Sequence, residues 1–127
     1  MKILIVEPCK SPREADIPHT LEAMQNVVGG YIQAIYPWED QVALVCDEEG
    51  LLKRSPFNRL ISPENPVFGT FFLCGLAEES FSDLPQAMIE KYAQLLRTPQ
   101  KMVLTPDGII VLPMLDSQLP KGDDEHV

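Results

Sequence analysis

Short apolar runs separated by proline, glycine and polar residues recur along the chain, and this pattern predicts β-strands. Residues 2–7 are rich in Ile, Leu and Val, which is typical of a strand covered on both faces. Residues 31–36 alternate cleanly between two faces, and residues 42–46 and 68–75 are further apolar runs. Residues 13–17 lie between prolines and carry charges, so they are expected to form a short edge strand.

Two segments have apolar residues at helical spacing. Thr20 can cap the first helix, and Gly29-Gly30 ends it where a positive φ is needed. Asp83 is expected to cap the second helix, with Pro85 in its first turn. The predicted apolar stripes are Leu21, Met24, Val27 and Val28 in the first helix and Leu84, Met88, Tyr92, Leu95 and Leu96 in the second.

Turn residues divide the remaining sequence. Residues 101–112 form two β-rich runs around Pro106-Asp107-Gly108, which predicts a hairpin with glycine at a position of positive φ. The polar turn at residues 47–50 suggests that Leu51 and Leu52 return as the second arm of another hairpin. Residues 53–67 contain three prolines and little periodicity, and are expected to form a loop across the surface.

Together these elements predict a single α+β domain over residues 1–115, in which a mainly antiparallel sheet is covered by two helices and extended or capped by the C-terminal hairpin. Parallel pairing of the first strand stays open. Residues 116–127 are polar and acidic, and are expected to be a disordered tail. The predicted core consists of Ile3, Ile5, Leu21, Met24, Val28, Ile32, Val42, Leu44, Phe71, Leu73, Met88, Tyr92 and Leu95.

The charge balance limits the classes of partner. Nineteen acidic and ten basic residues give the 127-residue chain a formal net charge of −9. This charge disfavours attraction to phosphate backbones and anionic lipid, so direct nucleic-acid binding is not expected and a protein partner with a basic surface is favoured. The alternative is that acidity serves solubility alone. Neither a secretory leader nor an apolar run of about 20 residues is visible, so a cytoplasmic protein is expected.

The sequence contains no recognisable catalytic or metal-binding motif. Its three cysteines lie far apart without CxxC spacing, which supports neither a disulfide framework nor a zinc site. Its two histidines, His19 and His126, have no partners nearby in sequence, and no acidic cluster has the spacing of a calcium loop. We therefore expect no metal and no cofactor. An enzyme is disfavoured, although a site assembled from distant residues stays open.

One basic stretch interrupts the acidic chain and is the best candidate site. Lys53, Arg54 and Arg59 lie close together in sequence, with Phe57 and Asn58 before the last of them. An arginine fork beside an amide and an aromatic ring suits a carboxylate, a phosphate or a nucleobase. These five residues are the candidate binding residues.

A structural role for Arg59 is the competing interpretation, and we favour it. Arg59 would then pair internally with Glu7 or with the turn at Asp47, and would hold the long loop against the sheet. Structural ion pairs cluster charge in the same way as binding sites do, so the sequence alone does not separate the two roles.

Several short motifs occur along the chain: Glu7-Pro8, Leu21, Val28-Gly29-Gly30-Tyr31-Ile32, Glu48-Glu49-Gly50, Pro56-Phe57-Asn58-Arg59, Gly69-Thr70-Phe71 and the helix over residues 81–92. Over about residues 2–96, this series resembles a known family, the uncharacterised domain of unknown function 3846. The resemblance implies a setting in bacteria, phages and integrative elements, often among anti-restriction and plasmid genes. It implies no established biochemical activity.

Three functional hypotheses follow. The first is a small acidic binding or adaptor protein of phage or mobile-element origin, with inhibition of host defence through protein–protein interaction as its role. The second is a protein that senses or sequesters a small phosphate or nucleotide ligand through the loop at Asn58 and Arg59. The third is an enzyme, for which no nucleophile with an adjacent base is visible.

Overall fold

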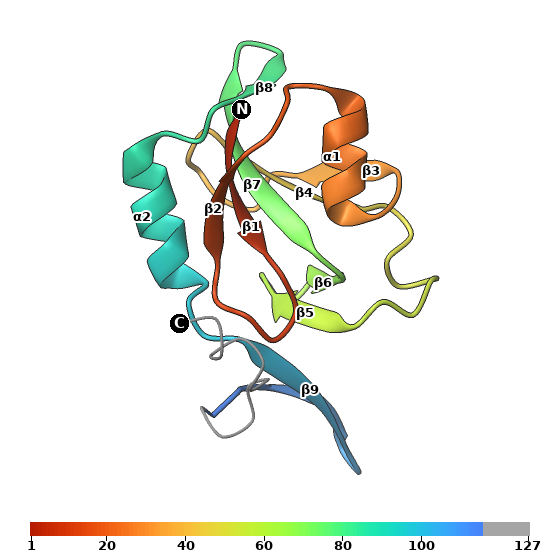
Figure 1. Cartoon of the computed structure of the whole chain (residues 1–127). Helices are drawn as coiled ribbons and strands as arrows, with labels where there is room; N and C mark the ends of the chain where they lie inside the picture. Colours follow the sequence, from red (N-terminus) through yellow and green to blue (C-terminus); the bar gives the residue numbers. More distant parts are fainter. Residues whose placement is uncertain (116–127) are drawn as a thin grey trace, which may run out of the picture.

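The computed structural model describes residues 1–115 and is built on an antiparallel sheet (Figure 1). The sheet has six strands: five follow the order β2-β1-β7-β4-β3, and β8 pairs with β7. These strands are β1 Lys2–Val6, β2 Arg13–Asp16, β3 Ile32–Ile35, β4 Val42–Asp47, β7 Phe71–Ala77 and β8 Ser80–Ser82. β1 runs antiparallel to both of its neighbours, which settles its direction. The predicted α+β class is confirmed, and β2 is the expected edge strand.

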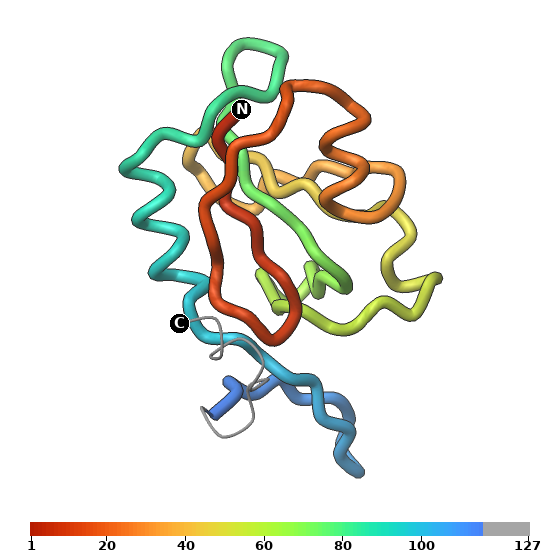
Figure 2. The backbone as a smooth tube through the Cα atoms, viewed as in Figure 1, coloured from red at the N-terminus to blue at the C-terminus, as the bar shows by residue number. Residues whose placement is uncertain are grey.

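Two separate hairpins accompany this sheet. The first pairs β5 (Phe57–Leu60) with β6 (Pro66–Phe68), so the prediction of an irregular loop over residues 53–67 is wrong. The second pairs β9 (Gln100–Thr105) with β10 (Gly108–Pro113) and confirms the predicted C-terminal hairpin, but this hairpin forms a two-stranded sheet of its own and does not extend the main sheet as predicted. Figure 2 shows this second hairpin extending away from the body of the protein.

The first helix forms as predicted. α1 spans Leu21–Val28, and the Thr20 side chain accepts a hydrogen bond from the Ala23 amide at 3.1 Å. Gly29 has a φ of 81°, so it provides the left-handed residue that ends the helix. The N-cap and the C-cap are both local signals, which is why the sequence was sufficient to locate them.

The second helix begins later than predicted. α2 spans Gln86–Leu95, and it starts after Pro85 without any side-chain cap. The predicted role of Asp83 is wrong because its carboxylate accepts a hydrogen bond from the backbone amide of Lys2 at 2.8 Å. Asp83 therefore fastens the approach to α2 onto the start of the sheet.

Each face of the sheet packs into its own hydrophobic cluster. On one face, α1 contributes Met24 and Val28. The opposite face is covered by α2 together with Val67 of β6. Because both faces are covered, every residue of β4 is buried, and its first five residues form a continuous apolar run before Asp47. The sheet residues in these clusters are Ile3, Ile5, Ala43, Val45, Phe72 and Cys74 on the α1 side and Leu4, Val6, Val42, Leu44, Cys46, Phe71 and Leu73 on the α2 side.

Several predicted positions differ from the structure. Leu51 and Leu52 lie in an exposed turn and form no hairpin arm, since β4 pairs with β3 and β7 instead. Leu21 and Leu95, assigned to the core, are 55% and 59% exposed, and the buried residues of the two helices are instead Met24 and Val28 in α1 and Ile89 and Tyr92 in α2. The predicted tail at residues 116–127 lies outside the described residues. No helix within residues 1–115 is long and apolar enough to cross a bilayer.

Leu44→Ala should reduce the free energy of unfolding by about 2 to 5 kcal/mol, because Leu44 has no exposed surface and lies in β4, between β3 and β7. Chemical denaturation of the purified variant measures this change. Leu52→Ala is the control, since Leu52 is 81% exposed and its loss should change stability by no more than about 0.5 kcal/mol. Equal denaturation midpoints for both variants would contradict the central placement of Leu44.

Candidate functional site

Asn58 and Arg59, the centre of the predicted binding loop, are enclosed by the protein. Neither residue has any exposed surface. The register between β5 and β6 shifts between Phe57 and Arg59, which marks a β-bulge at Asn58. A bulge interrupts the usual alternation of side chains, and here two consecutive polar side chains are both buried.

The Arg59 guanidinium donates all five of its N–H groups to protein oxygens. Its Nε and Nη2 atoms contact the carbonyl oxygen of Leu96 at 3.3 and 3.0 Å, and Nη2 also contacts the carbonyl oxygen of Lys10 at 2.8 Å. Its Nη1 atom donates to the carbonyl and to the side-chain oxygen of Asn58 at 3.3 and 2.9 Å. In this structure Arg59 therefore has no donor left for an anion.

Asn58 completes this arrangement, which we call the Asn58–Arg59 clamp. Its amide nitrogen donates to the carbonyl oxygens of Val6 and Gly69, both at 2.9 Å. Through Asn58 and Arg59 together, β5 is joined to the end of β1, to the turn before β7 and to the residue after α2. The clamp thus connects segments that are far apart in sequence.

Burial is the main electrostatic influence on the clamp. It lowers the pKa of Arg59 to about 10, while the nearby Cys9 opposes that shift. The predicted internal role of Arg59 is confirmed, but the predicted carboxylate partners are wrong. Glu7 accepts a hydrogen bond from Arg13 at 3.1 Å, and Asp47 forms an ion pair with Lys53 at 2.9 Å.

The other three candidate residues point to different surroundings. Lys53 donates to Asp47 and to the carbonyl oxygen of Gly29, so it fastens the turn after β4 to the end of α1. Arg54 is exposed and has a positive φ of 58°. Phe57 packs edge-on against Phe68, with 5.6 Å between ring centroids. The five residues therefore do not converge on one exposed surface.

The two edges of the main sheet differ in charge, and this difference reveals another candidate surface. The β2 edge carries Arg13, Glu14 and Asp16, which is the usual protection of an edge strand against pairing with another chain. The β3 edge has no charged residue from Tyr31 to Tyr36. These two tyrosines flank β3 and are 67% and 59% exposed.

The register of β3 shows which of its backbone groups face outward. The amide of Glu48 donates to the carbonyl oxygen of Tyr31 at 2.9 Å, so residue 31 bonds inward to the neighbouring strand. Bonding direction alternates along an antiparallel strand. Ile32 and Ala34 consequently direct their N–H and C=O groups to the free edge, where no further strand pairs within residues 1–115.

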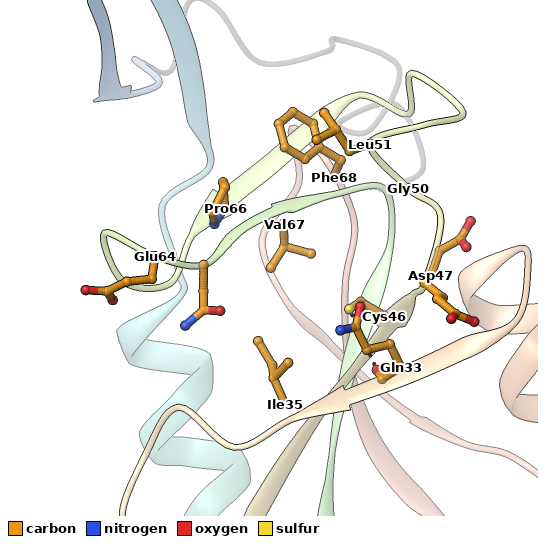
Figure 3. A pocket seen from close by; sticks show the side chains of 12 residues that line it. Gln33, Ile35, Cys46, Asp47, Gly50, Leu51, Glu64, Pro66, Val67 and Phe68 are labelled. Atoms are coloured by element: carbon orange, nitrogen blue, oxygen red, sulfur yellow. Dashed lines mark hydrogen bonds between the residues drawn. The ribbon is translucent and has the colours of Figure 1, made fainter.

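A pocket of about 180 Å³ lies beside this edge on the α2 side of the sheet. Gln33 and Ile35 line one wall, and Val67 and Phe68 line the facing wall (Figure 3). A more open hollow of about 480 Å³ lies on the α1 side, lined by Tyr36, Leu76, Glu78, Glu79, Ser80 and Phe81. The pocket therefore adjoins β3 itself, and the more open hollow adjoins Tyr36, the residue after β3.

Exposed carboxylates surround the same edge, and we call them the acidic rim: Glu48, Glu49, Glu64, Glu78 and Glu79. None of them forms an ion pair with a residue in the described part of the chain. Asp40 differs, because Lys91 and Tyr92 donate to it at 2.6 and 2.7 Å and hold its pKa below the usual range. The β3 edge thus has free backbone groups, adjacent hollows and the negative charge of the acidic rim.

Sequence reasoning identified β3 as a strand but not as a candidate site. The absence of charge in residues 31–36 was a readable signal, whereas the position of β3 at the sheet edge depends on strand order. Among residues 1–115, no group of three or more His, Cys, Asp or Glu side chains could hold a metal ion. Cys9, Cys46 and Cys74 are free thiols.

The fold and these surfaces define an acidic α+β protein with one open sheet edge. The chain belongs to the family described as Domain of unknown function (DUF3846), which matches residues 1–97. The hairpin of β9 and β10 lies beyond the matched region. Comparison with curated proteins and with solved structures finds no match for the chain in either.

Arg59→Ala should reduce the free energy of unfolding by roughly 3 to 5 kcal/mol, because it leaves the carbonyl oxygens of Lys10 and Leu96 without this donor and opens a cavity. Urea denaturation measures the change. Arg54→Ala is the matched control, since the exposed Arg54 should affect stability by no more than about 0.5 kcal/mol. An Arg59 variant as stable as the control would refute the clamp.

Alkaline pH should destabilise the fold through its buried thiols. Burial raises the pKa of Cys74 to about 12, so its contribution to stability is complete below the pKa of the unfolded chain and is lost as pH rises through the folded value. The free energy of unfolding falls by at most about 1.4 kcal/mol per pH unit for each such proton. Arg59 changes stability in the opposite direction. Because burial lowers its pKa to about 10, a rise in pH through that value removes the buried charge and stabilises the folded state.

A comparison of variants separates the contribution of the Cys74 thiol to the pH dependence of stability from that of Arg59. Between pH 9 and about 11, the free energy of unfolding of Cys74→Ala should fall less steeply with pH than that of the parent. Val45→Ala is the control, since Val45 is as buried as Cys74 in the same cluster but has no titratable group, so the variant should retain the parental slope. Parallel curves for the parent and Cys74→Ala would show that the Cys74 thiol does not contribute in this way.

Proposed function

We propose that this protein is a small cytoplasmic binding or adaptor protein that engages a basic protein partner at the β3 edge. The observation that carries the proposal is the acidic rim, whose carboxylates have no ion-pair partner in the described chain and surround an uncharged, open strand. Opposite charges across an interface speed association and exclude partners of the wrong sign. The rim therefore supports selection of a basic surface.

The charges nearest the rim strengthen this reasoning. No basic residue lines the pocket on the α2 side or the hollow on the α1 side, and Lys53, which lies near Tyr31 just before β3, already pairs with Asp47. A basic partner would meet carboxylates that are still free to pair with it. The same field would repel phosphate backbones and anionic lipid, in keeping with the net charge of −9.

The resemblance carried by the sequence motifs suggests the biological setting of the proposal. The protein would belong to a phage or mobile element, and its partner would be a host defence protein that it inhibits by occupying a basic surface. The alternative of phosphate or nucleotide sensing through Asn58 and Arg59 would require Arg59 to release the carbonyl oxygens that it now contacts. The free carboxylates of the rim favour the protein partner.

Neutralising the rim should weaken partner capture by roughly tenfold or more, since several charge pairs of modest energy would be lost together. The rim variant combines Glu48→Gln, Glu49→Gln, Glu78→Gln and Glu79→Gln. Proteins captured from a bacterial lysate by the immobilised parent chain are identified by mass spectrometry, purified and titrated against both chains. The captured proteins should be basic and should depend on the rim.

A control variant removes the same number of charges elsewhere, by Glu14→Gln, Glu22→Gln, Glu90→Gln and Asp107→Asn. These side chains lie on β2, α1, α2 and the tip of the C-terminal hairpin, and none of them lines a hollow beside β3 or its flanking tyrosines. Capture should survive in the control. Equal losses in both variants would show that overall charge, and not the rim, governs binding, and unchanged capture in both would contradict the proposed function.

A further inference from the structure

The open edge of β3 suggests how the partner is held. We propose that an extended basic segment of the partner adds to β3 as a new strand and bonds to the outward backbone groups of Ile32 and Ala34. This inference rests on the proposed function, because it takes the basic partner from it, but it makes a separate claim about binding mode. Strand addition to an exposed sheet edge is an established form of peptide recognition.

The length and composition of the edge suit this mode. β3 offers four residues of extended backbone, or roughly 13 Å at the usual rise per residue. No charged side chain, glycine or proline interrupts residues 31–36. The charges of β2 protect the opposite edge, so the same sheet has one edge that resists pairing and one that permits it.

The hollows would receive the side chains of the added strand. Successive side chains of a strand point to opposite faces of the sheet. The pocket on the α2 side adjoins Gln33 and Ile35, and the hollow on the α1 side adjoins Tyr36, so side chains on both faces of the incoming segment would have a place to enter. The backbone bonds would supply affinity, and the two hollows would supply selectivity.

The lining of these hollows indicates which side chains fit. On the α2 side, Ile35 and Val67 form apolar walls, and Glu64 lies at the rim. On the α1 side, Leu76 and Phe81 lie beside two glutamates. Arginine and lysine combine an apolar stem with a cationic end, so they match both the apolar walls and the carboxylates. The occupant is therefore an extended segment with basic residues that point to both faces.

A second copy of this chain fits the edge less well. Pairing of β3 with β3 would bring two acidic rims together, and each chain carries a net charge of −9. Like charges in such an interface are unfavourable. A partner with basic residues removes that repulsion and pairs the free carboxylates.

The test on the protein side uses Ala34→Pro. Proline removes the outward N–H of residue 34, and edge strands tolerate proline where the N–H faces solvent. Ala34→Val retains the N–H and is the matched control. The probe is the acetylated and amidated peptide Ser-Val-Arg-Val-Val-Arg-Val-Ser, whose two arginines point to opposite faces when it is extended. The proline variant should bind it roughly tenfold more weakly than the valine variant, with a denaturation curve confirming that both are folded.

The test on the peptide side does not depend on how the variant folds. One version of the peptide is N-methylated at its even positions and another at its odd positions, so that each lacks the N–H donors of one edge. Against the parent chain, one version should bind like the unmodified peptide and the other should lose binding by roughly tenfold or more. This asymmetry is specific to pairing along one edge.

The results separate the binding mode from the proposed function. Equal effects of the two methylation patterns, no binding of the unmodified peptide at millimolar concentration, or full binding to Ala34→Pro would each overturn strand addition. The proposed function would still stand if the rim variant, unlike its charge-matched control, failed to capture basic proteins. Loss of binding in Ala34→Pro together with the asymmetric peptide result supports strand addition.

Discussion

The structure depends on a buried guanidinium that no carboxylate within residues 1–115 neutralises. Arg59 is held by carbonyl and amide oxygens from Lys10, Asn58 and Leu96, and all of its donors are used. A charge buried in this way is costly unless every donor is satisfied, so the surrounding segments must keep their positions together. A two-stranded hairpin is only marginally stable by itself, and the clamp holds β5 and β6 against the main sheet.

The clamp also shapes the candidate binding surface. By holding β6 in place, it positions Val67 and Phe68 as the wall that faces β3 across the pocket on the α2 side. Charged residues consequently fall into two groups. Arg59 and the Lys53–Asp47 pair maintain the architecture, whereas the carboxylates of the acidic rim have no such partner in the described chain. Arg59 and the Lys53–Asp47 pair belong to the more conspicuous basic stretch of the sequence, but the carboxylates of the acidic rim are the charges available to another molecule.

The sequence predicted those elements whose signals are local. Thr20 and Gly29 mark α1, and the turn at Pro106-Asp107-Gly108 marks the last hairpin. It failed where distant contacts decide the structure: Asp83 bonds to Lys2 and does not cap α2, and the bulge at Asn58 conceals β5. The internal role of Arg59 was predictable, but its carbonyl partners were not, because they come from segments that only the fold brings together.

Prediction of the candidate site was limited in the same way. The sequence identifies residues 31–36 as a strand, but only the strand order shows that one side of this strand is unpaired.

Hydrogen exchange of backbone amides, measured by NMR with and without a captured basic partner, tests this account most directly. The amides of Ile32 and Ala34 should become strongly protected in the complex, and those of β2 should keep their exchange rates. Protection confined to another surface, with unchanged exchange at Ile32 and Ala34, would contradict the assignment of the β3 edge as the binding surface.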